Sequence, residues 1–189
     1  MQEKIKSELK ESIKTKELVI ETLLPQIEQA ARLMIEAIRT GHKIFFFGNG
    51  GSAADAQHLA AEFISRFLKE RKSLPAIALT TDTSIITAIS NDYNFSRIFA
   101  RQLEGLAQAG DIAFGLSTSG NSANVLEGMK KAKELGCKTI GLLGSDGGTI
   151  ALAVDLAITV ASENTPRVQE SHITIGHILC GLVEQEVCA

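Results

Sequence analysis

The sequence predicts an α/β protein built as a three-layer α/β/α sandwich, in which a five-stranded parallel sheet lies between two layers of helices. Three observations lead to this prediction. Five short apolar runs alternate with longer segments whose apolar residues recur at helical spacing. Glycine- or serine-rich turns directly follow two of the runs, as strand-to-helix turns do in such folds. A further helical pattern precedes the first run and predicts an N-terminal helical arm.

The apolar runs are typical of strands that are buried on both faces of a sheet. The expected strands are residues 43–47, 76–79, 112–116, 139–143 and 156–160. The expected helices are residues 53–67, 84–109 with breaks, 122–135, 149–153 and 168–187. Because strands that alternate with helices pair in parallel through crossovers, helices are expected on both faces of the sheet.

The N-terminal segment 1–40 has the apolar spacing of a helix, which Pro25 is expected to kink or divide and Gly41 to end. It carries more apolar side chains than a free tail leaves in water. We therefore expect it to pack on the rest of the chain or on another subunit. The predicted organisation is a helical arm over 1–40, for packing or oligomerisation, and one sandwich domain over 41–189.

Composition excludes several classes of protein. A chain of 189 residues suits one compact domain. Its formal net charge of -3 gives no general attraction to nucleic acid or acidic lipid, so neither nucleic acid nor a membrane is expected as a partner. No segment approaches the roughly 18 consecutive apolar residues of a membrane helix. The cysteines Cys137, Cys180 and Cys188 form no disulfide framework and favour a reducing compartment, the cytoplasm.

The first candidate binding loop is the turn Gly48–Ser52, which lies between a Phe-rich strand and the next helix. Glycines let a backbone approach a ligand closely, and the start of a helix offers free amides to an anion. A tight turn that needs positive φ angles explains the same residues without a ligand. No Gly-Lys-Ser/Thr follows, and Ala53 stands where the last glycine of a dinucleotide-binding turn belongs, so a nucleotide-binding domain is disfavoured.

The second candidate loop gathers four hydroxyls at the start of another helix: Ser117, Thr118, Ser119 and Ser122. Capping of the helix explains one of them but not four. Because each hydroxyl can donate to a phosphate oxygen, phosphate binding is the favoured interpretation. The loop contains no cationic side chain, which suits a sugar monophosphate better than a triphosphate.

Two helices carry groups that can move protons. His58 and Glu62 lie one helical turn apart, although a solvated surface pair has the same spacing. The last helix adds Gln169, His172 and His177 to an otherwise apolar stretch, where a single histidine is more commonly a buried structural residue. These groups are the candidates for acid–base chemistry.

The run Phe47–Ser52, followed by Asp55, His58 and Glu62, resembles the sugar isomerase (SIS) domain family and, within it, the phosphoheptose isomerases. The resemblance covers essentially the whole chain, and the combination of Glu62 with His177 makes it specific. It also rests on Asn91-Asp92, residues 117–122, residues 146–148 and residues 167–172.

This resemblance implies a flavodoxin-like SIS fold, a homotetramer, and interconversion of sedoheptulose 7-phosphate and D-glycero-D-manno-heptose 7-phosphate. The reaction is the first step of ADP- or GDP-heptose synthesis for bacterial surface polysaccharide, either lipopolysaccharide or capsule. By the resemblance, Glu62 is the base that moves a proton between C1 and C2, and His177 is its acid partner. The implied substrate contacts are Asn49, Gly50, Gly51, Ser52, Glu62, Asn91, Asp92, Ser117, Thr118, Ser119, Ser122 and Gln169.

The resemblance also implies one zinc ion per subunit, bound by His58, Glu62, Gln169 and His177. Nitrogen and oxygen ligands of this kind suit zinc. A carboxylate that is bound to zinc is a weaker base, so the zinc ion can be catalytic, structural or exchangeable, and all three roles are open. Gln169 and His177 are eight positions apart, or about 12 Å along a helix. Either Gln169 precedes the helix proper or a neighbouring subunit supplies one of the pair, which favours an oligomer with shared active sites.

A second interpretation is a non-catalytic SIS protein. Such proteins bind phosphosugars as regulators, or support replication initiators as tetrameric scaffolds, and they share the two loops. They are expected to lack the pair Glu62 and His177, which this chain has. The sequence therefore favours an enzyme.

Overall fold

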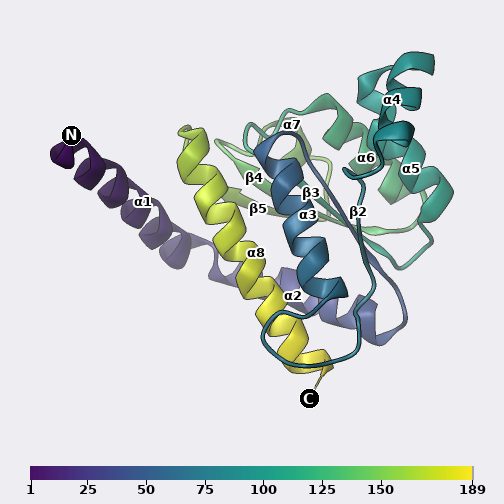
Figure 1. Ribbon diagram of the computed structural model, residues 1–189, viewed down its shortest axis with the longest axis horizontal. Coiled ribbons are helices and arrows are strands. Elements are labelled where there is room, and N and C mark those ends of the chain that lie inside the picture. Colours follow the sequence, from purple (N-terminus) through teal and green to yellow (C-terminus); the bar gives the residue numbers. More distant parts are fainter. Residues whose placement is uncertain (189) are drawn as a thin grey trace.

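The computed structural model describes residues 1–188 and confirms the predicted three-layer α/β/α sandwich (Figure 1). Its five strands are all parallel and lie in the order β2-β1-β3-β4-β5. They are β1 (Ile44–Phe47), β2 (Ala76–Ala78), β3 (Ile112–Ser117), β4 (Lys138–Gly144) and β5 (Leu156–Val160). Each expected strand is confirmed to within one residue at either end. Ala189, the end of the expected domain, lies outside the described residues.

The helices follow the expected order, with two refinements. Pro25 does divide the N-terminal segment, since the helix breaks at Leu23 and Pro25 lies in the first turn of the next helix. The last helix begins at Thr165, three residues earlier than expected, with Pro166 in its first turn. The helices are α1 (Gln2–Thr22), α2 (Leu24–Arg39), α3 (Gly51–Ile64), α4 (Thr83–Asp92), the 3-10 turn η1 (Phe95–Arg97), α5 (Ile98–Leu106), α6 (Ala123–Glu134), α7 (Gly148–Ala151) and α8 (Thr165–Val187). Within residues 1–188, no helix is long and apolar enough to cross a membrane.

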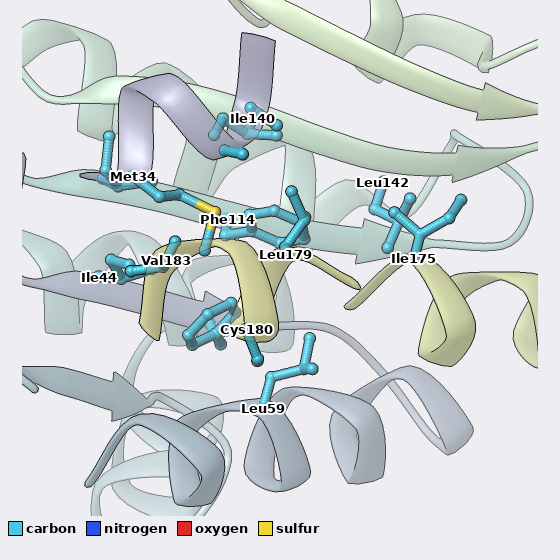
Figure 2. Close-up of a cluster of buried hydrophobic side chains, with 14 of the residues drawn as sticks. Met34, Ile44, Leu59, Phe114, Ile140, Leu142, Ile175, Leu179, Cys180 and Val183 are labelled. Atoms are coloured by element: carbon cyan, nitrogen blue, oxygen red, sulfur yellow. The ribbon is translucent and has the colours of Figure 1, made fainter. Parts of the chain in front are cut away.

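The two faces of the sheet carry separate cores, because successive side chains of a strand point to opposite faces. Phe46 of β1 packs in the core under α2, α3 and α8, whereas Phe45 and Phe47 pack in the core under α5 and α6. Figure 2 shows part of the first core, in which Met34, Leu59, Ile175, Leu179, Cys180 and Val183 from these helices surround Ile44, Phe114, Ile140 and Leu142 of the sheet.

The strand order creates a crevice at the carboxyl ends of β1 and β3. The chain passes from β1 outward to β2 and then returns to β3 on the other side of β1. Phe47, the last residue of β1, is paired with Gly115 of β3, so both strands end at the same edge. The loop after β1 leads into α3 on one face, and the loop after β3 leads into α6 on the other. Such a switch point is where open α/β sheets bind ligands.

Helix α1 projects from the body of the protein and packs along the start of α8 (Figure 1). The guanidinium of Arg167 on α8 donates to the Glu8 carbonyl oxygen at 2.7 Å and to Glu8 Oε2 at 3.0 Å. The opposite side of α1 presents an apolar stripe in which every side chain is more than half exposed: Ile5, Leu9, Ile13 and Ile20. The arm therefore packs on the domain with one face and leaves the other uncovered.

Helices α3 and α8 approach each other closely at Gly176. A Cβ atom at this position would lie 2.6 Å from Cδ2 of Leu59, which is fully buried. The absence of a side chain at Gly176 thus sets the separation of the two helices. His58 and His177 are the residues next to this contact point, so the same approach brings their imidazoles together.

We predict that Gly176→Ala destabilises the protein although alanine is the better helix former. Overpacking against Leu59 costs about 1–3 kcal/mol, which exceeds the helix-propensity gain of about 1 kcal/mol. Gly105→Ala in α5 is the matched control, because nothing lies within 4 Å of its Cβ position. Urea denaturation at one protein concentration should show a lower free energy of unfolding for Gly176→Ala and an unchanged or higher one for Gly105→Ala. Equal gains in both variants would contradict the tight contact.

A buried histidine ties α8 to the sheet. His172 is fully buried, and its Nε2 lies 3.0 Å from the Leu143 carbonyl oxygen of β4, to which it donates. Its Nδ1 is buried and has no hydrogen-bond partner among the described residues. Burial lowers the pKa of His172 to about 4, although the hydrogen bond to Leu143 acts in the opposite direction. The folded protein therefore holds this imidazole neutral.

His172 should make the stability depend on pH between its unfolded pKa of 6.5 and its folded pKa of about 4. In that window the unfolded chain binds one proton more, so the group's contribution is complete above pH 6.5 and falls by about 1.4 kcal/mol per pH unit below it. In His172→Gln the amide can still donate to Leu143 but does not titrate. The stability difference between wild type and variant should shrink by about 2 kcal/mol from about pH 7 to about pH 5. A difference that stays constant would mean that the pKa of His172 is the same in the folded and the unfolded chain.

Candidate functional site

The glycine loop after β1 turns directly into α3, and the amides of Ser52 and Ala53 donate to the carbonyl oxygens of Asn49 at 3.0 Å and Gly50 at 3.1 Å. Gly50 has a φ of 56°, which favours glycine, and the N-terminus of α3 has no side-chain cap. Gly50 and Gly51 are exposed, whereas the Ser52 side chain is buried. A cavity of 140 Å³ borders this loop and is lined by Gly48, Asn49, Gly50, Ala53, Thr80, Ile86, Phe95, Ile98 and Phe99. The loop thus has the backbone and the space to receive an anion.

The hydroxyl loop, residues 117–122 after β3, also leads into a helix that has no side-chain cap. Ser122 occupies the N-cap position of α6, yet its side chain caps no amide of the helix. Instead its Oγ lies 2.9 Å from Oγ of the buried Ser117. Ser119 is exposed and accepts only a weak hydrogen bond from the Asn121 amide at 3.2 Å. Capping of α6 therefore does not account for these hydroxyls, of which that of Ser119 is the exposed one.

Two asparagines join the loops across the crevice. Asn49 Nδ2 donates to Asn124 Oδ1 at 2.8 Å, and Asn124 Nδ2 donates to Asn49 Oδ1 at 2.7 Å. The pair fixes the spacing between the glycine loop and the start of α6. Sequence analysis did not single out Asn124, and its only signal was an amide side chain in the first turn after the hydroxyl loop.

Gln169 lies at the glycine loop. A Cβ atom on Gly51 would lie 2.3 Å from Nε2 of Gln169, so the amide of α8 rests against the backbone at the start of α3. The structure thereby brings this predicted contact residue to the same edge as Gly50 and Ser52. Because α8 begins at Thr165, the alternative in which Gln169 precedes the helix is wrong.

His58, Glu62 and His177 form a cluster on the adjoining faces of α3 and α8. Nε2 of His177 lies 2.9 Å from Nε2 of His58, and that same His58 nitrogen lies 3.2 Å from Oε1 of Glu62. The two Nε2 atoms therefore face each other beside the carboxylate. The cluster thus combines a carboxylate with two nitrogen bases at one point on the surface.

This cluster fits a zinc ion. One nitrogen or oxygen atom from each of the three side chains can be chosen so that all lie within 4.8 Å of one another. Two imidazoles and a carboxylate are a frequent ligand set of catalytic zinc, which keeps a further position open. Gln169 of the same chain does not join them, because it is eight residues, or about 12 Å, along α8 from His177. The expected set of four ligands is therefore incomplete within one chain.

Asp55 lies one turn before His58 on α3. Its Oδ2 is buried and has no hydrogen-bond partner within residues 1–188. Burial raises the pKa of Asp55, while His58 and His177 nearby act in the opposite direction. The sequence motif included Asp55 without assigning it a role, and the signal that it belongs to the cluster was its spacing of three from His58.

Asn91 and Asp92 lie apart from the other candidates at the end of α4. Asn91 Nδ2 donates to Asp92 Oδ1 at 2.8 Å, and both side chains are exposed. None of the side chains of α4 is buried. In the described part of the chain, no hydrogen bond joins the side chains of this pair to either loop or to the cluster.

The chain matches known proteins over nearly its whole length. The family model of the SIS domain matches residues 9–144. The chain is 60% identical over 185 residues to a phosphoheptose isomerase of a Nitratiruptor species, an alignment that covers 98% of this chain and 99% of the relative. It is 53% identical over 188 residues to a phosphoheptose isomerase of Aquifex aeolicus, with coverage of 100% of this chain and 98% of the relative.

A solved structure agrees with these relatives. The phosphoheptose isomerase of Neisseria gonorrhoeae superposes with a TM-score of 0.93 at 44% sequence identity and covers 97% of this chain and 98% of that chain. With so high an identity, the likeness extends beyond the shared fold. The chain therefore belongs to the SIS domain family and, within it, to the phosphoheptose isomerases, which are enzymes.

Proposed function

We propose that this isomerase converts sedoheptulose 7-phosphate to D-glycero-D-manno-heptose 7-phosphate by moving a proton between C1 and C2. The observation that carries the proposal is the meeting of Glu62 with His58 and His177 in one cluster. Aldose–ketose exchange needs a base beside the carbon acid and a second group that serves the oxygens. The Glu62 carboxylate and the His177 imidazole, whose polar atoms lie within 4.8 Å of each other, supply both.

Glu62 takes the proton from one carbon and returns it to the other, and His177 exchanges protons with the substrate oxygens. The ring nitrogens suit this second role because a neutral imidazole donates at one nitrogen and accepts at the other. His58, Glu62 and His177 would hold a zinc ion, which when bound would supply positive charge for the oxygen that becomes negative during enolisation.

The phosphate end of the substrate binds at the edge formed by β1 and β3. The starts of α3 and α6 support this assignment, because neither has a side-chain cap at its N-cap residue and the positive end of a helix dipole favours an anion. We assign the contacts to the loop residues Asn49, Gly50, Gly51, Ser52, Ser117, Thr118, Ser119 and Ser122, together with Gln169, Asn91 and Asp92.

We propose that two subunits share each site and that the protein is a homotetramer. Ser52 and Glu62 are ten residues apart on α3, or about 15 Å along the helix axis, so the loops and the cluster of one chain are well separated. Loops and Gln169 from a neighbouring subunit can complete the cluster, with Gln169 as the fourth zinc ligand. The uncovered apolar stripe of α1 supports an interface between copies of the chain.

The biological setting follows from the family. We place the reaction at the first step of ADP- or GDP-heptose synthesis for a bacterial surface polysaccharide, and the enzyme in the cytoplasm. The cysteines Cys137, Cys180 and Cys188 are all free, which suits a reducing compartment. A regulator that only binds phosphosugars is the second candidate function, and the presence of both Glu62 and His177 counts against it.

Glu62→Gln and His177→Gln should each lower kcat by about 100- to 10,000-fold, because each removes a group that transfers protons. The assay follows product formation from sedoheptulose 7-phosphate by NMR, and calorimetry measures binding of the sugar phosphate to Glu62→Gln. His42→Gln is the control, since His42 lies before β1 at the opposite edge of the sheet. A wild-type protein that binds the sugar phosphate but never converts it, with or without zinc, would instead establish the regulator.

Mixed oligomers test whether sites are shared. Glu62→Gln and Gln169→Ala subunits, inactive separately, should recover about a quarter of wild-type activity when co-expressed in equal amounts, because a quarter of the sites then pair two intact halves. Oligomers of either variant alone are the controls, and their zinc content is measured in parallel. If one subunit supplies both residues, every mixed site lacks one of them and activity stays absent.

A further inference from the structure

A buried carboxylate organises the connection between α3 and β2. Glu184 on α8 has a side chain that is only 2% exposed. It accepts hydrogen bonds from the backbone amides of Phe67 at 2.9 Å and of Leu68 and Lys69 at 2.8 Å, and from Nε of Arg71 at 2.9 Å. Four donors on one carboxylate hold residues 67–71 against α8 in a single arrangement.

Arg71 links Glu184 to the last turn of α3 by hydrogen bonds. Its guanidinium is almost fully buried and donates to the carbonyl oxygen of Glu62 at 2.7 Å and to that of Phe63 at 2.9 Å. These are carbonyls that the end of a helix leaves without partners. The backbone that carries the Glu62 carboxylate is therefore bonded, through Arg71, to Glu184 on α8.

Phe67 links Glu184 to His177, because its amide donates to Glu184 and its ring lies on the imidazole. The two rings stack with centroids 5.6 Å apart and an angle of 26° between their planes. The Phe67 ring also lies over Gly181, since a Cβ atom there would be 3.4 Å from its Cε1 atom. His177, Gly181 and Glu184 follow one another at spacings of four and three, so they share one face of α8. Phe67 covers that face between the imidazole and the carboxylate.

Glu184 stays ionised under physiological conditions. Burial by itself raises the pKa of this carboxyl, but the amides of Leu68, Phe67 and Lys69 and the Arg71 guanidinium outweigh burial and lower the pKa to about 2. The donors are thus matched to a carboxylate, and a neutral side chain of the same shape cannot accept all four hydrogen bonds equally well.

We propose that Glu184 and Arg71 are positioning residues for the His58–Glu62–His177 cluster, and that they act by holding the end of α3 and the Phe67 ring in place. The anchored backbone sets the direction of the Glu62 side chain, and the stacked ring sets the plane of the His177 imidazole. The effect on turnover rests on the proposed isomerase function, whereas the effect on the His177 ring stands independently of it.

The test compares Glu184→Gln and Phe67→Leu with a matched control, Asp111→Asn. Asp111 is also fully buried, and it accepts from the amides of Lys43 and Gln108 and from Nζ of Lys43. It precedes β3 at the opposite edge of the sheet from the crevice. Removal of its charge should destabilise the fold in a similar way without reaching the cluster. Phe67→Leu keeps an apolar side chain and all four donors to Glu184, so it remains informative if Glu184→Gln folds poorly.

Two readouts are needed, both at a temperature where each variant is folded. The first is the ring-current shift of the His177 ring protons, measured by NMR on metal-free protein with labelled histidine. The second is kcat and KM with sedoheptulose 7-phosphate. We expect Glu184→Gln to lose the ring-current shift of Phe67 on His177. Both Glu184→Gln and Phe67→Leu should lower kcat about 10- to 100-fold, with KM changed by less than about threefold. Asp111→Asn should change neither readout.

The two proposals can fail separately. If the wild type lacks isomerase activity, the shift of the His177 ring protons still decides whether Glu184 holds Phe67 on the imidazole. If Glu184→Gln keeps both the shift and the wild-type kcat and Phe67→Leu keeps the wild-type kcat, or if Asp111→Asn lowers kcat as much as they do, the positioning role is refuted. Glu184 and Arg71 then serve stability alone.

Discussion

The close contact of α3 with α8 is the constraint on which the rest of the site depends. Gly176 lacks the side chain that would separate the helices, and Leu59 fills the space between them. His177 follows Gly176 on α8, and His58 precedes Leu59 on α3. The contact between Gly176 and Leu59 in the core therefore brings the two imidazoles within hydrogen-bonding distance at the surface. Because such a core is close-packed, this geometry cannot drift without loss of stability.

The strand order supplies the second half of the arrangement. β1 and β3 are neighbours, yet the helices that follow them cover opposite faces, so two uncapped helix starts meet at one edge of the sheet. The Asn49–Asn124 pair holds these loops at a set distance. The proposed anion-binding edge lies at the beginning of α3, and the proposed proton-transfer cluster lies toward its end. This separation within one chain is the physical reason to expect that neighbouring subunits contribute to a common site.

Two residues that take no part in proton transfer, Glu184 and Arg71, hold the end of α3 and the segment after it in place. Glu184 gathers four donors from one connection, and Arg71 bonds to the carbonyl of Glu62 itself. Buried ion pairs of this kind cost desolvation and are seldom justified by stability alone. Here the pair also determines which way a short irregular segment leaves α3, and thereby where Phe67 meets His177.

The sequence by itself determined the layers, the five strands, the division of the N-terminal helices at Pro25 and the two candidate ligand loops. These features are local: buried parallel strands must be apolar on both faces, and proline, glycine and serine impose their own turn chemistry. The tertiary structure alone decided that His58, Glu62 and His177 meet while Gln169 stays at Gly51, and that Asn124, Glu184 and Phe67 support the site. Those relations depend on the distance and rotation between helices that are far apart in the chain, and side-chain packing sets both quantities.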